Sequence, residues 1–288
     1  MESIIYSNEA FKPRLKEMWK LCFGDSDSFI DFYFDKIYRN DNTLILLSGD
    51  GLPVASLQIL LYQIKIKKSI YDARYISGAM THPAHRKKGY MKQLLNVAFK
   101  EMKKQDFTFS FLIPQEDYLF DFYAKHGYEK AFPKSDQTIS LKEISPDYDQ
   151  VEIYLDFKNL PINEIYYLYN IFLNQKENTI LKTQEQFEFI LENLFIDNGC
   201  LFYLKNKSFA FVATERSNVL VKEIFNISND FRQLFAAIKN TYQTDIIILP
   251  NKNLIDENNQ YYGMIKVLDT LKFLRPAPKN IYMSMMMD

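Results

Sequence analysis

One short segment constrains the fold more than any other part of the sequence. A strand-like run, Ile70–His82, enters a basic loop, and the loop leads through Gly89 into an amphipathic helix that reaches about Lys104. Apolar residues recur at helical spacing along that helix: Met91, Leu94, Leu95, Ala98 and Met102. The sequence here therefore predicts a strand, a basic loop and a helix with one apolar stripe, in that order.

The loop between this strand and helix has the properties of an anion-binding site. The start of a helix carries unpaired amides and about half a positive charge, and a glycine lets a ligand approach the backbone. Seven of the residues in Arg86–Lys104 are basic and one, Glu101, is acidic, although the net charge of the chain is −1. The seven are Arg86, Lys87, Lys88, Lys92, Lys100, Lys103 and Lys104. We therefore expect the loop to bind phosphate. A solvated basic turn is the alternative.

The spacing of the loop excludes two common phosphate motifs. The sequence contains neither the G-x-x-x-x-G-K-[ST] of a P-loop nor the G-x-G-x-x-G of a dinucleotide fold. What it contains is R-x-x-G, as Arg86-Lys87-Lys88-Gly89. A second glycine, Gly78, lies within the preceding strand and indicates a bulge or a close approach of another group.

The order of predicted elements partly repeats along the chain. Each half is predicted to contain a strand, two helices, three strands, a helix and a strand. In the first half these are Ser3–Tyr6, Glu9–Phe23, Ser26–Tyr38, Thr43–Ser48, Pro53–Ile66, Ile70–His82, Gly89–Lys104 and Phe107–Ile113. In the second half they are Val151–Leu155, Asn163–Gln175, Thr183–Phe195, Gly199–Leu204, Ser208–Thr214, Val219–Ile227, Asp230–Asn240 and Thr244–Leu249. We interpret this order as a degenerate internal duplication.

Three further segments complete this prediction. A helix over Glu116–Lys125 ends at Gly127, and Tyr128–Leu141 supplies one or two closing strands of the first half. The segment Ser145-Pro146-Asp147 resembles a linker, so we expect domains at residues 1–145 and 146–288. The final residues, Ile281–Asp288, are apolar enough to form a last strand.

These motifs resemble those of the GNAT superfamily of acyl-CoA-dependent N-acetyltransferases. The pyrophosphate loop of that family is [QR]-x-x-G-x-[GA], and here Met91 takes the sixth position. A second family signature, Tyr-x-x-x-Gly-[FY], is matched by Tyr123, Gly127 and Tyr128. The two similar halves resemble the enhanced-intracellular-survival acetyltransferases. The resemblance implies an α+β (α/β) fold, with a GNAT-like mixed sheet flanked by helices, followed by a second, degenerate GNAT-like domain.

The resemblance also implies an activity. It implies transfer of an acyl group, most simply acetyl, from acetyl-CoA to an amine by direct attack in a ternary complex, without a metal. The implied cofactor-binding loop is Arg86, Lys87, Lys88, Gly89, Tyr90 and Met91, and the implied oxyanion donors are the backbone amides of Ala79, Met80 and Thr81. Tyr123 is the implied acid that protonates the departing thiolate, since a phenol has a pKa near 10.

The base that accepts the proton of the attacking amine has two candidate sources. The resemblance implies the terminal carboxylate, at Asp288, delivered by the last strand. Glu116 and Asp117, at the start of the last helix of the first half, are the alternative, although helix capping explains them equally well.

The acceptor amine is left open between a small molecule and a peptide. Asp25, Asp27, Asp31 and Asp35 form an acidic edge. This edge is either a solvated helix face or a landing surface for a cationic substrate.

The second half lacks the features of the basic loop. Its matching segment, Asn226–Arg232, has no glycine and no cluster of cations. Ser228, Asn229 or Asp230 would cap the following helix and occupy the amides that a phosphate needs. We therefore expect one cofactor site per chain.

Composition narrows the setting and the partners. A net charge of −1 argues against a nucleic acid or an anionic membrane as partner. No apolar run approaches the roughly 20 residues of a membrane helix, and Glu2 and Asn8 do not suit a signal peptide. Cys22 and Cys200 do not form a disulfide framework, and His82-x-x-His85 is interrupted by Pro83 and lacks further metal ligands. We expect a cytoplasmic protein of open oligomeric state.

Two other functions stay open at this point. A GNAT-like module could bind CoA without catalysis and regulate another process. A transferase built from two similar halves could instead use aminoacyl-tRNA, in which case the chain would bind RNA and not CoA.

Overall fold

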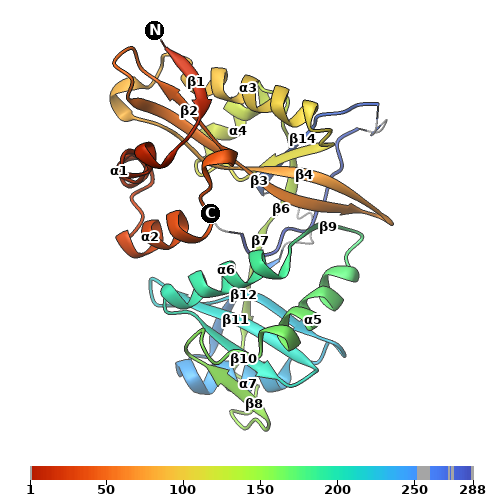
Figure 1. Ribbon diagram of the computed structural model, residues 1–288. Helices are drawn as coiled ribbons and strands as arrows, with labels where there is room; N and C mark the ends of the chain where they lie inside the picture. Colours follow the sequence, from red (N-terminus) through yellow and green to blue (C-terminus); the bar gives the residue numbers. More distant parts are fainter. Residues whose placement is uncertain (1, 252–259, 272, 274–275, 287–288) are drawn as a thin grey trace. The chain divides into compact units, whose positions relative to one another are not determined.

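The computed structural model describes residues 2–251, 260–271, 273 and 276–286, and the chain forms two compact units. The first unit comprises Met1–Ala131 and Tyr261–Lys279, and the second comprises Phe132–Gln260 and Asn280–Met287. Each unit therefore contains chain from both halves of the sequence. Figure 1 shows this by colour, because the blue strand β14 lies among red to yellow elements. The division into domains at residues 1–145 and 146–288 stays a prediction.

The first unit is built on one mixed sheet in the order β1-β2-β3-β4-β5-β14-β6. Its strands are β1 (Ser3–Tyr6), β2 (Thr43–Leu47), β3 (Pro53–Ile66), β4 (Ser69–Thr81), β5 (Phe109–Leu112), β6 (Glu129–Pro133) and β14 (Tyr261–Val267). The first four are antiparallel, β4 and β5 are parallel, and β14 runs antiparallel to β5. The sequence analysis predicted the first six of these strands, with β6 inside Tyr128–Leu141, but no strand at residues 261–267.

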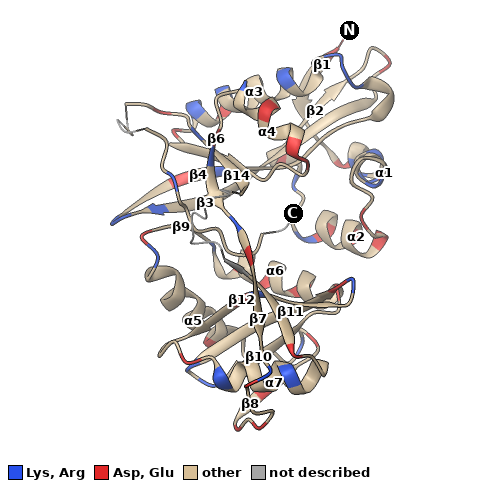
Figure 2. Cartoon of the chain, turned by 180° about the vertical axis from the view of Figure 1, so that it is seen from behind, with Lys and Arg blue, Asp and Glu red and all other residues tan. Residues whose placement is uncertain are grey.

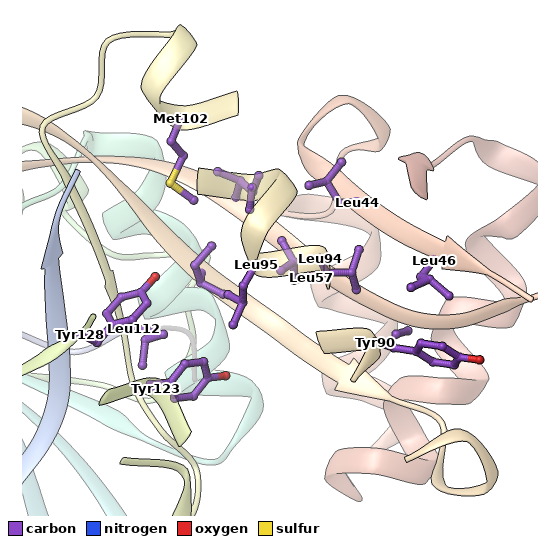
Figure 3. Packing of buried hydrophobic residues seen from close by; sticks show 14 of the residues in the cluster. Leu44, Leu46, Leu57, Tyr90, Leu94, Leu95, Met102, Leu112, Tyr123 and Tyr128 are labelled. Carbon is purple, nitrogen blue, oxygen red and sulfur yellow. The ribbon is translucent and has the colours of Figure 1, made fainter. Parts of the chain in front are cut away.

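Four α-helices and three short 3-10 turns accompany this sheet: α1 (Lys12–Phe23), α2 (Asp27–Lys36), α3 (Tyr90–Lys104), α4 (Asp117–Ala124), η1 (Glu9–Phe11), η2 (Asn40–Asn42) and η3 (Pro83–His85). Helix α1 ends at Gly24 with a φ of 76°, and the Ser26 hydroxyl accepts the Phe29 amide at 3.2 Å. The predicted stripe of α3 is buried against the sheet: Leu94, Leu95, Ala98 and Met102, joined by Tyr90 (Figure 3).

The second unit has a sheet in the order β7-β13-β12-β11-β10-β8. Its strands are β7 (Ser135–Ser140), β8 (Val151–Tyr154), β10 (Cys200–Leu204), β11 (Ser208–Glu215), β12 (Asn218–Asn226) and β13 (Ile246–Asn251), with β9 (Asn178–Leu181) outside that order. Its helices are α5 (Ile162–Asn174), α6 (Gln184–Ile196) and α7 (Arg232–Tyr242). The parallel pair β12–β13 repeats the parallel pair β4–β5, in agreement with the repeated element order.

The two sheets exchange strands between the halves of the sequence. Next to its last parallel strand, the first sheet takes β14 from the second half, and the second sheet takes β7 from the first half. The prediction that Tyr128–Leu141 closes the first half is therefore wrong for β7. Its six residues pair with β13 from Ile246↔Ser140 to Asn251↔Ser135. Strand partners of this kind are set by long-range pairing, which a local pattern does not contain.

The predicted C-terminal strand is also corrected. Of Ile281–Asp288, the described residues 281–286 form a single bridge, between Thr179 and Tyr282. The apolar character that suggested a strand comes instead from burial, because Ile281 and Met283 are both 0% exposed. Residues 287 and 288 lie outside the described residues.

Candidate active site

The basic loop joins β4 to α3 and presents free backbone amides. Gly89 is the N-cap of α3 with a φ of 79°. Because glycine has no side chain, it cannot cap the first amides of the helix. The first helical hydrogen bond runs from the Gln93 amide to the Gly89 carbonyl at 3.2 Å. Within the described residues, no acceptor is bonded to the amides from Lys87 to Lys92. These donors and the helix dipole make the loop suited to an anion.

The side chains around the loop hold it against the unit. Arg86 does not point freely outward, since its Nε donates to the Thr81 carbonyl at 3.2 Å. Tyr90 is 6% exposed, and its hydroxyl donates to Glu2 at 2.5 Å. Met91 packs partly against the core, so the residue that departs from the family pattern is turned toward the sheet. Lys87 and Lys88 are exposed, and Figure 2 shows further basic residues along α3.

Gly78 produces a bulge in β4, as the sequence analysis expected. The register passes from Gln58↔Ser77 to Ser56↔Met80, so two residues of β4 lie opposite one of β3. Gly78 has a φ of 53°, and a Cβ there would lie 2.6 Å from Cζ3 of Trp19. Both predicted reasons for this glycine, the bulge and the close approach, are therefore present.

Strand β5 pairs with the middle of β4 but not with its C-terminal end. The parallel register of β4 with β5 runs from Ala73↔Phe109 to Tyr75↔Phe111, and β4 continues to Thr81. The His82 amide donates to Val54 of β3 at 2.9 Å. Because successive peptide groups of a strand point to opposite sides, the Thr81 amide points away from β3 and the Met80 amide toward it. Of the predicted oxyanion donors, Thr81 therefore has the more favourable direction.

Tyr123 is held in the last turn of α4. Its side chain is 6% exposed and its ring lies 5.8 Å from that of Tyr128 (Figure 3). Its carbonyl accepts the His126 amide at 2.9 Å and the Tyr128 amide at 3.2 Å. Gly127, with a φ of 82°, ends the helix as predicted. Burial, with a contribution from Tyr118, raises the pKa of Tyr123 above its ordinary value, so the hydroxyl keeps its proton at neutral pH.

A buried polar network next to the bulge was missed by the sequence analysis. The Tyr33 hydroxyl lies 2.9 Å from the Ser77 hydroxyl and donates to Gln58 at 3.3 Å. All three residues are buried, and burial raises the pKa of Tyr33. The available signal was a polar residue next to apolar neighbours in each strand: Gln58 between Leu57 and Ile59, and Ser77 after Ile76.

Two of the three candidate bases, Glu116 and Asp117, lie within the described residues. Glu116 is the N-cap of α4 but makes no side-chain hydrogen bond to it, and both Glu116 and Asp117 are exposed. Capping therefore does not account for the Glu116 side chain. Asp288 lies outside the described residues, so its role stays a prediction.

The acidic edge of α2 is paired with lysines of α1. The distances are 2.6 Å for Lys20–Asp27, 2.7 Å for Lys16–Asp31 and 3.8 Å for Lys12–Asp35. The remaining carboxylate, Asp25, accepts the Trp19 indole N–H at 2.7 Å. Each carboxylate thus has a partner within the first unit, which favours the helix-face interpretation over a landing surface for cations.

The matching loop of the second unit differs in the expected way. Asp230 accepts the Arg232 amide at 3.1 Å and the Arg232 guanidinium at 2.9 and 2.5 Å. These hydrogen bonds lower the pKa of Asp230 to about 2. The carboxylate therefore occupies an amide at the start of α7 and repels an incoming anion.

Two other features of the described residues bear on chemistry and location. No group of three or more His, Cys, Asp or Glu side chains among them could hold a metal ion. None of their helices combines the length and apolar character needed to cross a membrane.

The comparison with protein families decides what the first unit is. A family model described as "Acetyltransferase (GNAT) domain" matches residues 3–131. Residues 3–131 thus match the GNAT acetyltransferase family. The matched region contains the basic loop, the bulge and Tyr123, so the resemblance seen in the sequence is confirmed.

Solved GNAT-fold structures cover most of the chain. A probable N-acyltransferase from Enterococcus faecalis V583 has a TM-score of 0.76 at 14% identity, over 95% of this chain and 74% of that one. A GCN5-related N-acetyltransferase from Anabaena variabilis has a TM-score of 0.73 at 17% identity, over 94% and 74%. Eis1 from Mycobacterium abscessus has a TM-score of 0.68 at 11% identity, over 93% and 74%. These likenesses confirm the predicted mixed α/β fold. A search of the curated proteins gives no match.

Proposed function

We propose that this GNAT chain transfers an acetyl group from acetyl-CoA to an amine by direct attack in a ternary complex. The observation that carries the proposal is the set of free amides from Lys87 to Lys92 at the start of α3, next to the end of β4 that no longer pairs with β5. The amides would hold the CoA diphosphate, and the thioester would lie along β4. With the diphosphate at these amides, residues 86–91 would contact the cofactor.

The chemistry assigns a role to each group at the site. The amine nitrogen attacks the thioester carbonyl, a C–N bond forms, and the negative charge on oxygen is stabilised by the Thr81 amide. The C–S bond then breaks, and the Tyr123 hydroxyl gives its proton to the CoA thiolate. The amide nitrogen loses its extra proton, and the Tyr123 phenolate regains one, so that the protons balance. Glu116, Asp117 or the terminal carboxylate at Asp288 would remove the proton from the attacking ammonium. We propose a small-molecule or peptide amine as acceptor and the cytoplasm as the location.

A Tyr123→Phe substitution tests the proposal. We expect kcat for free-thiol release to fall about 10²- to 10⁴-fold, the range for loss of a general acid. The Kd for acetyl-CoA should change less than about twofold, because the hydroxyl acts in the transition state and not in cofactor binding. Isothermal titration gives the Kd and a thiol reagent gives the rate over a panel of amines.

The same measurements separate the alternatives. Binding of CoA without turnover of any amine by the unaltered chain would support a non-catalytic CoA-binding module. Binding of RNA without affinity for CoA would support a tRNA-dependent transferase, and either result would refute the proposal.

A further inference from the structure

One residue of the second half of the sequence lies at the end of the helix that carries Tyr123. Lys266 is in β14, the strand that inserts beside β5, and its Nζ donates to the His126 carbonyl at 2.7 Å. The residues are 140 positions apart in sequence. His126 lies two residues beyond Ala124, the last residue of α4, and directly before Gly127.

The surroundings of Lys266 direct its ammonium to this carbonyl. Within the described residues no carboxylate lies within ion-pair distance of Nζ, and Nζ lies 4.9 Å from the centre of the Phe99 ring. Burial and the nearby Lys103 lower the pKa of Lys266. The cation is therefore partly desolvated, and a charged donor in such a place forms a stronger hydrogen bond than an exposed one.

Gly127 leaves the space that this contact needs. A Cβ at Gly127 would lie 2.5 Å from the Lys266 Nζ and 3.9 Å from its Cε. The glycine of the Tyr-x-x-x-Gly-[FY] signature thus has two reasons in this chain: its φ of 82° and the passage of a lysine over its backbone.

A second tether starts from the residue opposite Lys266. In the antiparallel register, Lys266 pairs with Ser110 of β5, and directly opposed residues project to the same face of a sheet. The Ser110 hydroxyl lies 2.7 Å from the Tyr128 hydroxyl, and the Tyr128 amide donates to the Tyr123 carbonyl. The cross-strand pair therefore fixes the chain on both sides of Gly127.

We propose that Lys266 is a positioning residue of the transferase, which fixes the direction of the Tyr123 hydroxyl by holding the end of α4. The inference rests on the proposed function, in which Tyr123 protonates the CoA thiolate. Lys266 touches neither cofactor nor acceptor in this role. It makes catalysis in the first unit depend on a strand from the end of the chain.

The test compares Lys266→Met, Lys266→Arg and Tyr123→Phe, alone and combined, in the full-length chain. Methionine keeps the apolar stem but removes the donor, whereas arginine keeps a charged donor. We expect Lys266→Met to lower kcat about 10- to 100-fold, as a misplaced catalytic group does, with the Kd for CoA and the KM for acetyl-CoA changed less than about twofold. Lys266→Arg should recover most of kcat.

The combined variant separates positioning from general damage to the fold. If Lys266 acts through Tyr123, Lys266→Met lowers kcat no further once Tyr123→Phe is present. Lys130→Met is the matched control, because Lys130 Nζ lies 5.2 Å from the Phe120 ring of α4, and the exposed Lys130 should leave kcat unchanged.

Two results would overturn the inference and leave the proposed function standing. One is that Lys266→Met lowers kcat by the same factor in the unaltered chain and in the Tyr123→Phe variant. The other is an unchanged kcat for Lys266→Met when Tyr123→Phe is defective. If Tyr123→Phe itself keeps full activity, the acid role of Tyr123 is wrong, and the inference falls with it.

Discussion

At the scale of single residues, Gly78 is a position where one added methyl group would clash with the core of the first unit. The added Cβ would lie 2.6 Å from a ring carbon of Trp19 and 3.3 Å from Nε2 of Gln58, at a φ of 53°. Trp19 is 5% exposed and packs on Tyr33 and Phe34, so its ring has little room to move.

We expect Gly78→Ala to lower the free energy of unfolding by about 2 to 4 kcal/mol, from overpacking and a left-handed backbone together. Gly51→Ala is the control, because its φ is 81° but no atom lies within 4 Å of the added Cβ. That variant should lose about 1 kcal/mol, from the backbone alone. Urea unfolding measures both, and equal losses would show that the Trp19 contact does not matter.

The candidate site shows what single residues reveal in sequence and what they conceal. Gly78, Gly89 and Gly127 could be predicted because a glycine reports a backbone requirement. The direction of the Arg86 side chain could not, because it depends on where the Thr81 carbonyl points. Lys266 could not be predicted at all, since its contact requires the pairing of β14 with β5.

At the scale of elements, α1 and α2 are joined by the three ion pairs that run between them. Their carboxylates are 66% to 75% exposed, so water and salt screen the pairs strongly. The pairs therefore contribute little to stability.

A double-mutant cycle on Lys16 and Asp31 measures how much one of these ion pairs contributes to stability. Lys16→Met, Asp31→Asn and the double variant should give a coupling free energy of about 0.2 to 1 kcal/mol at low salt. In 1 M salt, where screening acts over about 3 Å, the coupling should fall close to zero. A coupling above about 2 kcal/mol that persists in salt would contradict the weak-pair interpretation.

Most elements could be predicted because their signals are local. Ser26 and Gly24 mark helix ends, and the α3 stripe follows a helical period. The two missed strands, β9 and β14, are short or follow a weakly patterned stretch, and their partners lie far away in sequence. The final apolar residues misled the analysis because burial and strand formation produce the same composition.

At the scale of the whole molecule, the exchange of β7 and β14 means that neither half of the sequence contains a complete sheet. Residues 1–145 include β5 but not β14. Met264 of β14 and Leu268, which follows the strand, lie in the core of the first unit and are 1% and 5% exposed. Removing a single large core side chain costs about 2 to 5 kcal/mol, against a usual total of 5 to 15.

We therefore expect a fragment of residues 1–145 to show no cooperative thermal transition and to aggregate through the uncovered edge of β5. The full-length chain is the control, and differential scanning calorimetry with light scattering is the measurement. A soluble fragment that unfolds cooperatively and binds CoA would show that β14 is dispensable for the fold of the first unit.

The late position of β14 also has a consequence for biosynthesis. Roughly 150 residues must be translated after β5 before β14 exists, which takes about 7 to 30 s at the usual rate of ribosomes. Throughout that interval the nascent chain carries β5 with an unfilled place beside it. Chaperones that bind such edges on the ribosome should therefore affect the yield of this protein more than that of a GNAT domain whose strands are consecutive.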